Sequence, residues 1–232
     1  MSKAITDRIW SNMVEVKGGV FRMGATPDQG GDAFDSERPV NSVKLDTFRI
    51  CRFQVTQGEW QILMGDNPSH FRGDLSLPVE TVSWDDAEFF LAHLNSLTKG
   101  RYRFPTEAEW EYAARGGLLS QKYKYSGSNN SDEVAWTSAN SEDRPHPVGK
   151  LKPNELGLYD MSGNVWEWCR DRYEGYMEKS LINPQGPASG RIRVLRGGGW
   201  NNDSDYARVS SRLINLPDSR INYQGFRLAF QD

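Results

Sequence analysis

The second half of the chain, from residue 117 onward, has no long stretch with a helical or strand-like hydrophobic period, because Gly, Ser, Asn and Pro interrupt it throughout. Only short strands are expected there, at 193–196, 207–210 and 225–230. Eight Trp and 22 Gly indicate a loop-rich fold that buried aromatic side chains hold together. Long loops in a compact domain are uncommon and usually functional, so we expect the function in this half.

The first half carries clearer signals of regular structure. Strands are expected at 19–24 and at 43–51, and in the second of these apolar and polar side chains alternate. Three helices are expected to begin after Thr56, Ser83 and Thr106. Thr56 with Glu59 and Thr106 with Glu109 have the spacing of a capping box, and Ser83 is a cap with Asp85 and Asp86 in the first turn. We therefore predict an α+β class with long irregular loops. With 232 residues and no linker-like segment, residues 1–232 are expected to form one domain.

Charge and cysteine content exclude several classes of protein. The formal charge is only −3, which gives no electrostatic footprint for nucleic acid. No apolar run approaches the ~20 residues of a membrane span, and the first residues lack the apolar core of a signal peptide. We expect a monomer, at the cell surface or secreted if a leader precedes the given sequence. Cys51 and Cys169 could form one disulfide or stay free.

Seven short motifs occur in a fixed order along the chain. They are GGVFRMG (18–24), VTQGEW (55–60), PVETVSW (78–84), FPTEAEWEYAAR (104–115), GLYDMSGNVWEW (157–168), RGGGW (196–200) and GFRL (225–228). In this order they resemble the formylglycine-generating-enzyme (sulfatase-modifying factor) family over about residues 14–230. The resemblance implies a variant of the C-type lectin fold.

The residues that the family's enzymes use are missing. Those enzymes carry a cysteine pair that holds copper just after the RGGSW-like motif, and thiolates suit Cu(I). Here residues 200–207 contain no cysteine, and Asn202 stands where the first thiol is expected. The iron-dependent relatives need a histidine cluster, whereas His70, His93 and His146 have no paired spacing. We therefore expect no copper and no enzyme; the alternative is a formylglycine-generating copper oxidase or another enzyme of the family.

Residues 201–223 have an unusual composition, because Lys, Glu, Gln, Met and Trp are all absent from them. An AAC codon mutated only at its adenines reaches Asn, Asp, Ser, Tyr, Ile and Leu, but none of those five. The segment resembles the variable region of diversity-generating-retroelement proteins, which end in the same Gly-Phe-Arg-Leu phrase. The resemblance implies a non-enzymatic, receptor-like protein whose variable region, at about 200–226, binds a protein or glycan on another cell or a phage.

The segment divides into two predicted sets. The residues expected to vary and to bind the ligand are Asn202, Asp203, Asp205, Tyr206, Ser211, Leu213, Ile214, Asn215, Leu216, Ser219, Ile221, Asn222 and Tyr223. The residues expected to form a fixed framework are Ala207, Arg208, Val209, Arg212, Pro217, Asp218, Arg220, Gly225 and Phe226. Tyrosine and clustered aliphatic side chains suit a recognition surface. The alternative is that they are ordinary core of the last strands.

A calcium site is implied by the resemblance of residues 160–167. The implied ligands are the carboxylates of Asp160 and Glu167 and the backbone carbonyls of Gly163 and Val165. Calcium prefers such a mixture of oxygens, and its role would be structural. The alternative is a metal-free turn in which Glu167 binds backbone amides.

Four other groups have a functional and a structural interpretation. Trp166 and Trp168 could stack on a sugar, but the core is favoured. The carboxylates of Glu107, Glu109 and Glu111 could act as an acid–base pair, but a capping box and a helix surface explain them better. The arginines could bind an anion, but buried salt bridges are favoured; they are Arg208, Arg212, Arg220 and Arg227. His93 is expected on a solvated helix face.

Overall fold

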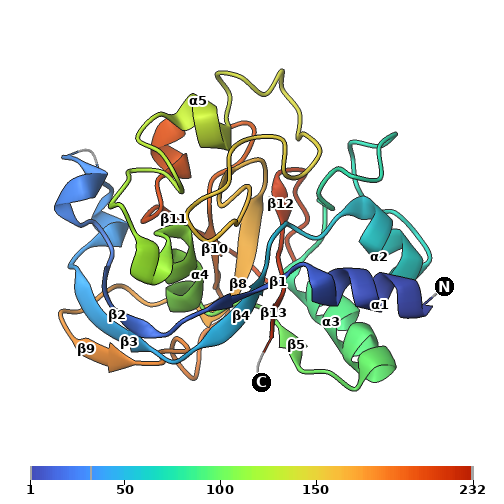
Figure 1. Ribbon diagram of the computed structural model, residues 1–232, viewed down its shortest axis with the longest axis horizontal. Coiled ribbons are helices and arrows are strands. Elements are labelled where there is room, and N and C mark those ends of the chain that lie inside the picture. The colour runs from blue at the N-terminus through green and yellow to red at the C-terminus, as the bar shows by residue number, and fades with distance from the viewer. Residues whose placement is uncertain (1, 32, 231–232) are drawn as a thin grey trace.

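The computed structural model, which describes residues 2–31 and 33–230, contains both helices and short strands, in agreement with the predicted α+β class. The helices are α1 Ser2–Ser11, α2 Gln57–Met64, α3 Trp84–Thr98, α4 Glu107–Ala114 and α5 Ser131–Val134. Short 3₁₀ helices are η1 Pro27–Gln29, η2 Asp35–Glu37, η3 Gly117–Leu119 and η4 Ser204–Ala207. As Figure 1 shows, α1, α2 and α3 lie together on one side of the molecule and α4 lies on the other.

The strands of the described residues form four small sheets. The first has the order β1 (Met13–Val16), β4 (Phe48–Cys51), β13 (Ala229–Phe230), β5 (Tyr102–Arg103). The second has the order β11 (Arg212–Asn215), β10 (Arg193–Arg196), β8 (Trp166–Arg172), β12 (Gln224–Gly225). The third is β2 (Gly19–Met23), β3 (Asn41–Leu45), β9 (Ser180–Ile182), and β6 (Ala135–Trp136) pairs with β7 (Ser162–Gly163).

The three predicted helix starts are confirmed. The side chains of Thr56, Ser83 and Thr106 each accept a hydrogen bond from the backbone N–H three residues later, and the acidic side chain there accepts one in return. These reciprocal bonds satisfy N–H groups that the first turn of a helix leaves without partners.

Aromatic side chains form much of the core, as their number predicts. One cluster, between α1–α3 and the β8 sheet, contains Trp60, Phe90, Trp166, Trp168 and Phe226. A second cluster surrounds α4 and the strands β2 and β3. Trp166 and Trp168 are fully buried, so the core interpretation of this pair is confirmed and no sugar-stacking face is exposed.

Three predicted strands differ from the structure. The stretch 43–51 is divided between β3 and β4, and 225–230 between β12 and β13, because the chain changes sheet within each. The strand predicted at 207–210 is wrong: these four residues are all buried, and they form the end of η4 and a turn. Their polar–apolar alternation does not reflect a half-exposed strand, because the Arg208 guanidinium is itself buried in an ion pair.

Cys51 and Cys169 are both buried free thiols, so the disulfide alternative is not realised. Burial, reinforced by the nearby Glu59 carboxylate, raises the pKa of the Cys51 thiol to about 12. Neither thiol therefore has the exposure or the low pKa of a reactive cysteine. Within 2–31 and 33–230, none of the helices has the length and apolar character to cross a membrane.

Candidate ligand-binding surface

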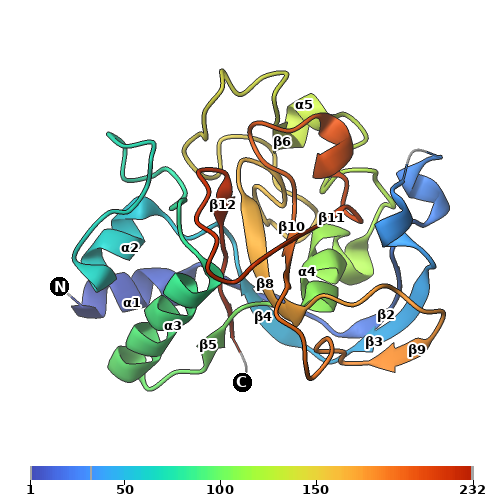
Figure 2. The same ribbon diagram turned by 180° about the vertical axis from the view of Figure 1, so that it is seen from behind.

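Residues 201–223 cross one face of the molecule, the face that Figure 2 presents to the viewer. The segment forms η4, then β11 at the edge of its sheet, and then a connection to β12. Twelve of the thirteen residues predicted to vary are exposed or half-buried. We call nine of them the C-terminal surface: Asp203, Asp205, Tyr206, Ile214, Asn215, Leu216, Ser219, Ile221 and Asn222.

Large apolar side chains lie on this surface. Tyr206, Ile214 and Leu216 are 37%, 40% and 41% exposed, respectively. The phenol ring of Tyr206 packs against Phe34, with 5.0 Å between the ring centroids, so its orientation is supported from below. Partly exposed aromatic and aliphatic groups held on a stable base are typical of recognition surfaces.

Buried ion pairs hold the backbone of the same segment. Arg208 and Glu37 are both fully buried and make two hydrogen bonds, of 2.6 and 2.7 Å. Burial alone would raise the pKa of Glu37, but hydrogen bonds from Arg208, Ser210 and the Phe34 backbone hold it below its ordinary value. Arg212 binds both oxygens of Glu107 at 2.6 and 2.9 Å.

The buried-salt-bridge interpretation therefore holds for three of the four arginines. Arg208, Arg212 and Arg227 are buried and paired with a carboxylate. Arg220 is the exception, since its side chain is 53% exposed where it pairs with Asp86. Within 201–223 the buried residues form one block, 207–212, and the predicted framework residues outside it, Pro217, Asp218 and Arg220, are half-buried or exposed.

Some of the residues predicted to vary have a structural role. Ser211 was expected on the surface, but it is fully buried between Arg208 and β11, and this expectation is wrong. Leu213 and Tyr223 are half-buried and pack against the aromatic core. The amide oxygen of Asn202 accepts a 2.7 Å hydrogen bond from the buried Trp166 indole. The Asn202 side chain therefore stabilises the core.

The three glutamates of α4 do not lie on a helix surface, and that expectation is wrong. Glu107, Glu109 and Glu111 are at most 8% exposed. Each is paired with an arginine: Glu107 with Arg212, Glu109 with Arg103 and Glu111 with Arg115. The capping role of Glu109 is confirmed, since its carboxylate accepts from the Thr106 N–H. His93 is exposed on α3, as predicted.

Two segments distant in sequence complete this face, and local patterns gave no sign of them. Phe34, from the loop between η1 and η2, supports Tyr206. His70 and Arg72, from the loop after α2, line a shallow hollow of about 650 Å³ together with Ile221 and Asn222. The hollow is open and basic, and it lies at the end of the C-terminal surface that is nearest α2.

Three of the four residues implied as calcium ligands lie around a side-chain amide, Asp160 through its backbone carbonyl, whereas the Asp160 carboxylate accepts from the Gly149 N–H and Gly163 pairs with Trp136 in the β6–β7 sheet. The Nε2 of Gln54 donates to the Asp160 carbonyl at 3.3 Å, the Val165 carbonyl at 2.9 Å and Glu167 Oε1 at 3.0 Å. A hydrogen-bond donor therefore lies among the oxygens that a calcium ion would need.

The carboxylates of this group are also engaged. Both oxygens of Glu167 accept from the Arg227 guanidinium, at 2.6 and 2.7 Å, and Oε2 accepts from the Trp110 indole as well. Glu167 thus binds side chains and not the backbone amides of the metal-free alternative. Burial raises the pKa of Asp160 to about 6. No group of three or more His, Cys, Asp or Glu in the described residues is arranged to hold a metal. The donors as arranged do not fit calcium, and calcium binding remains an untested expectation.

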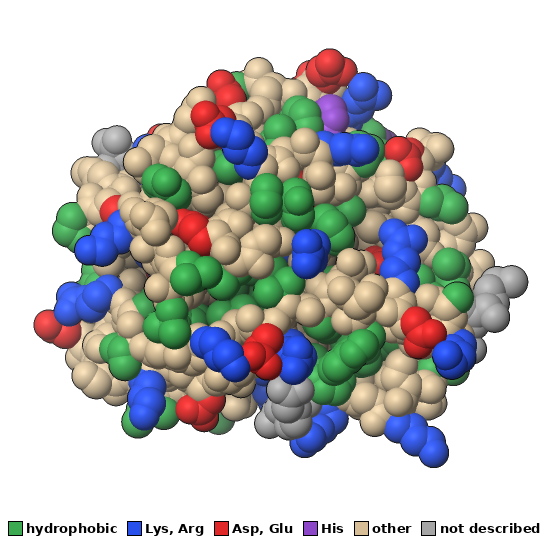
Figure 3. Space-filling view, in the orientation of Figure 1, with side chains coloured by type: hydrophobic (Ala, Val, Ile, Leu, Met, Phe, Trp, Pro, Cys, Tyr) green, Lys and Arg blue, Asp and Glu red, His purple; other side chains and the backbone are tan. Residues whose placement is uncertain are grey.

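The opposite face has a different character. In Figure 3, Lys and Arg side chains are mixed there with Asp, Glu and apolar groups, and neither sign of charge dominates. This face offers no continuous basic surface of the kind that a nucleic-acid backbone requires.

These features define a C-type-lectin-like scaffold, and the chain belongs to the formylglycine-generating-enzyme (sulfatase-modifying factor) family: the model of the sulfatase-modifying factor enzyme 1-like domain matches residues 3–231. The chain is 35% identical to the chaperone protein LppX of Paenibacillus barcinonensis, over 86% of this chain and 82% of that protein. It is 32% identical to the formylglycine-generating enzyme of Streptomyces coelicolor, over 97% and 91%. The structure of Treponema denticola variable protein 1 is similar with a TM-score of 0.87 and 32% identity, over 95% of each chain.

Proposed function

We propose that this protein binds a macromolecular ligand, a protein or glycan on another cell or a phage, through the C-terminal surface. The surface side chains would be varied by a diversity-generating retroelement, while the buried part of the same segment stays constant. The observation that carries the proposal is the division of 201–223 into one buried block, 207–212, held by the ion pairs of Arg208 and Arg212, and two flanking stretches, 201–206 and 213–223, whose side chains, such as Tyr206 and Leu216, are exposed or half-buried.

Two further facts support the proposal. The segment lacks the five residue types that adenine-directed mutation of AAC codons does not produce. The protein is also similar along 95% of its length to a solved structure that is itself named a variable protein. A scaffold that keeps its fold while surface residues change is what such a mutagenesis system requires, because most harmful substitutions affect buried groups.

A binding protein is favoured over an enzyme by the chemistry of residues 200–207. Thiolates are the ligands that Cu(I) prefers, and this segment contains only amide, carboxylate, hydroxyl and apolar side chains apart from Trp200. Asn202, at the place of the first thiol, is hydrogen-bonded to Trp166. The family includes enzymes, but the groups that would carry out their chemistry are replaced here by structural ones.

The proposal is tested by sequencing the gene and its neighbouring DNA in many cells of one population. We expect a near-copy of codons 200–228 beside a reverse-transcriptase gene. Differences among cells should occur where that copy has adenine, mainly in the codons of the C-terminal surface. The codons of 104–115, in the same reads, serve as the matched control and should show only the background error rate. Differences spread evenly over both regions, or no near-copy, would contradict the proposal.

A further inference from the structure

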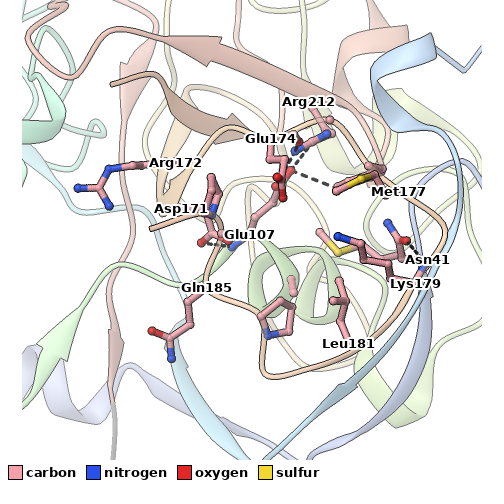
Figure 4. Close-up of a pocket in the computed structure, with 17 residues that line it drawn as sticks. Asn41, Glu107, Asp171, Arg172, Glu174, Met177, Lys179, Leu181, Gln185 and Arg212 are labelled. Carbon is pink, nitrogen blue, oxygen red and sulfur yellow. Dashed lines mark hydrogen bonds and ion pairs between the residues drawn. The ribbon is translucent and has the colours of Figure 1, made fainter. Parts of the chain in front are cut away.

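A cavity of about 270 Å³ lies away from the C-terminal surface, between the end of β8, the first turn of α4 and the loop around 174–187. Figure 4 shows its lining, with Asp171 and Glu107 on one side and Met177, Lys179 and Leu181 on the other. Most of the wall is apolar, and it includes Met23, Tyr176, Pro184 and Pro187. The volume is just below the ~300 Å³ at which typical small-molecule sites begin, so it suits a ligand the size of one amino-acid side chain.

The carboxylate of Asp171 lines this cavity without a cationic partner. Asp171 is only 4% exposed, and its Oδ2 accepts a 2.9 Å hydrogen bond from the Glu107 backbone N–H. Its Oδ1 has no hydrogen-bond partner in the described part of the chain, and no Lys or Arg nitrogen there lies within 4.0 Å of the carboxylate. Buried carboxylates are normally paired, because leaving water costs several kcal/mol.

Two of the cationic groups near Asp171, Arg212 and Arg196, are already paired with other carboxylates, and the other cations nearby, Arg170, Arg172 and Lys179, make no ion pair with Asp171 in the described residues. Arg212 binds both oxygens of Glu107, and Arg196 lies 3.3 Å from the same carboxylate while it also pairs with Glu111. Their positive charge is therefore largely cancelled, and neither forms an ion pair with Asp171.

Burial and the nearest carboxylates disfavour the ionised form of Asp171. Burial, together with the charges of Glu107 and Glu109, raises the pKa of Asp171 to about 8, and the Glu107 N–H and Arg170 lower it by less. The other charged groups that line the cavity are Arg172 from β8, Glu174 and Lys179 from the loop, and Arg212 from β11. A cation beside Oδ1 would be attracted, and it would favour the ionised form of the acid.

We propose that this cavity binds a small organic cation, a primary ammonium or guanidinium on a short alkyl chain, with Asp171 as its counter-ion. The methionine, proline and leucine side chains of the wall would cover the alkyl chain. Such a ligand supplies the charge that the buried carboxylate lacks and removes apolar surface from water. The cavity is separate from the C-terminal surface, so this inference is independent of the function proposed above.

Calorimetric titration of the full chain with n-butylammonium, and with n-butanol as its uncharged counterpart, tests the proposal. We expect the ammonium to bind at least tenfold more tightly than the alcohol. Below a pH of about 8, affinity should fall by up to tenfold per pH unit, because the ligand binds the ionised acid and must displace its proton. Equal binding of the two compounds, or affinity that does not change between pH 6 and 9, would refute it.

Variants and a second ligand make the test specific. Asp171→Asn keeps an oxygen for the Glu107 N–H but removes the charge, and should lower ammonium affinity at least tenfold; Asp143→Asn, at an exposed position, should leave it unchanged. If Asp171→Asn binds as the unaltered protein does, Asp171 is not the counter-ion. Nα-acetyl-lysine N-methylamide distinguishes two sources of the same chemistry. If this lysine derivative binds, the cavity accepts a lysine side chain of a partner protein. If only butylammonium binds, the ligand is a free amine.

Discussion

Replacement of Arg208 by Met is expected to lower the free energy of unfolding by about 3–5 kcal/mol, the usual cost of breaking a buried ion pair by removing one partner. The Glu37 carboxylate is fully buried and would keep only two donors, the Ser210 hydroxyl and the Phe34 backbone N–H. Urea denaturation followed by tryptophan fluorescence measures the change. Because Arg208 fixes the turn after η4, we also expect the variant to expose the segment around Tyr206 to proteolysis.

Arg220→Met is the matched control, since it removes the same kind of side chain from the same segment. Arg220 makes an equally short pair with Asp86, of 2.7 Å, but its side chain is 53% exposed. Exposed pairs contribute about 0–1 kcal/mol, so the control should be nearly as stable as the unaltered protein. Comparable losses in the two variants would show that the buried pair is not what holds the segment.

Replacement of Phe226 by Ala is expected to cost about 3–5 kcal/mol, as for other large aromatic residues in a core. Phe226 is fully buried, with its ring centroid 5.4 Å from that of Phe90 and 5.9 Å from that of Phe104. It also lies between β12 and β13, so its loss would loosen two sheets at once. Thermal denaturation followed by circular dichroism would show a lower melting temperature.

Phe89→Ala controls for the loss of a phenyl ring as such. Phe89 lies on α3 and is 65% exposed, so its truncation should change stability by no more than about 0.5 kcal/mol. If Phe226→Ala proved as mild as this control, the core would have to close over the missing ring, and the GFRL motif would not be a structural anchor.

Much of the fold was predictable because its signals are local. A helix cap needs only residues three positions apart, and the caps at Thr56, Ser83 and Thr106 were all found from the sequence. The burial of Trp166 and Trp168 followed from the general behaviour of aromatic residues. The rest of the architecture was predicted from the family resemblance, which the domain match over 3–231 confirms.

The wrong predictions, for 207–210, Ser211 and the glutamates of α4, share a physical cause. The burial of these residues depends on contacts between segments that are distant in the sequence. Arg208 finds its partner Glu37 171 positions away, so nothing near 207–210 showed that a charged residue there would be buried. Ser211 is covered because the chain turns inward between two such arginines. The glutamates of α4 are paired with arginines of β10, β11 and β5.

Only part of the C-terminal surface was predictable, because the rest of it also depends on contacts between distant segments. The unusual composition of 201–223 located the segment, but it did not separate exposed members such as Ile214 from half-buried ones such as Leu213. The contribution of the loops with Phe34 and His70 could not be read from composition at all. The amide of Gln54 among the implied calcium ligands was equally invisible, because it lies more than 100 positions away from them in the chain.

The central claim is that one segment combines replaceable exposed side chains with a buried framework that tolerates little change. Its most direct test is a display library with every single substitution at 200–228, sorted for resistance to protease and sequenced. The account predicts that Asp203, Asp205, Tyr206, Ile214, Leu216 and Ile221 accept most residue types, and that Arg208, Val209, Ser211, Arg212 and Phe226 accept few. If the exposed positions were depleted as strongly as the buried ones, the segment would be ordinary core and the account would be wrong.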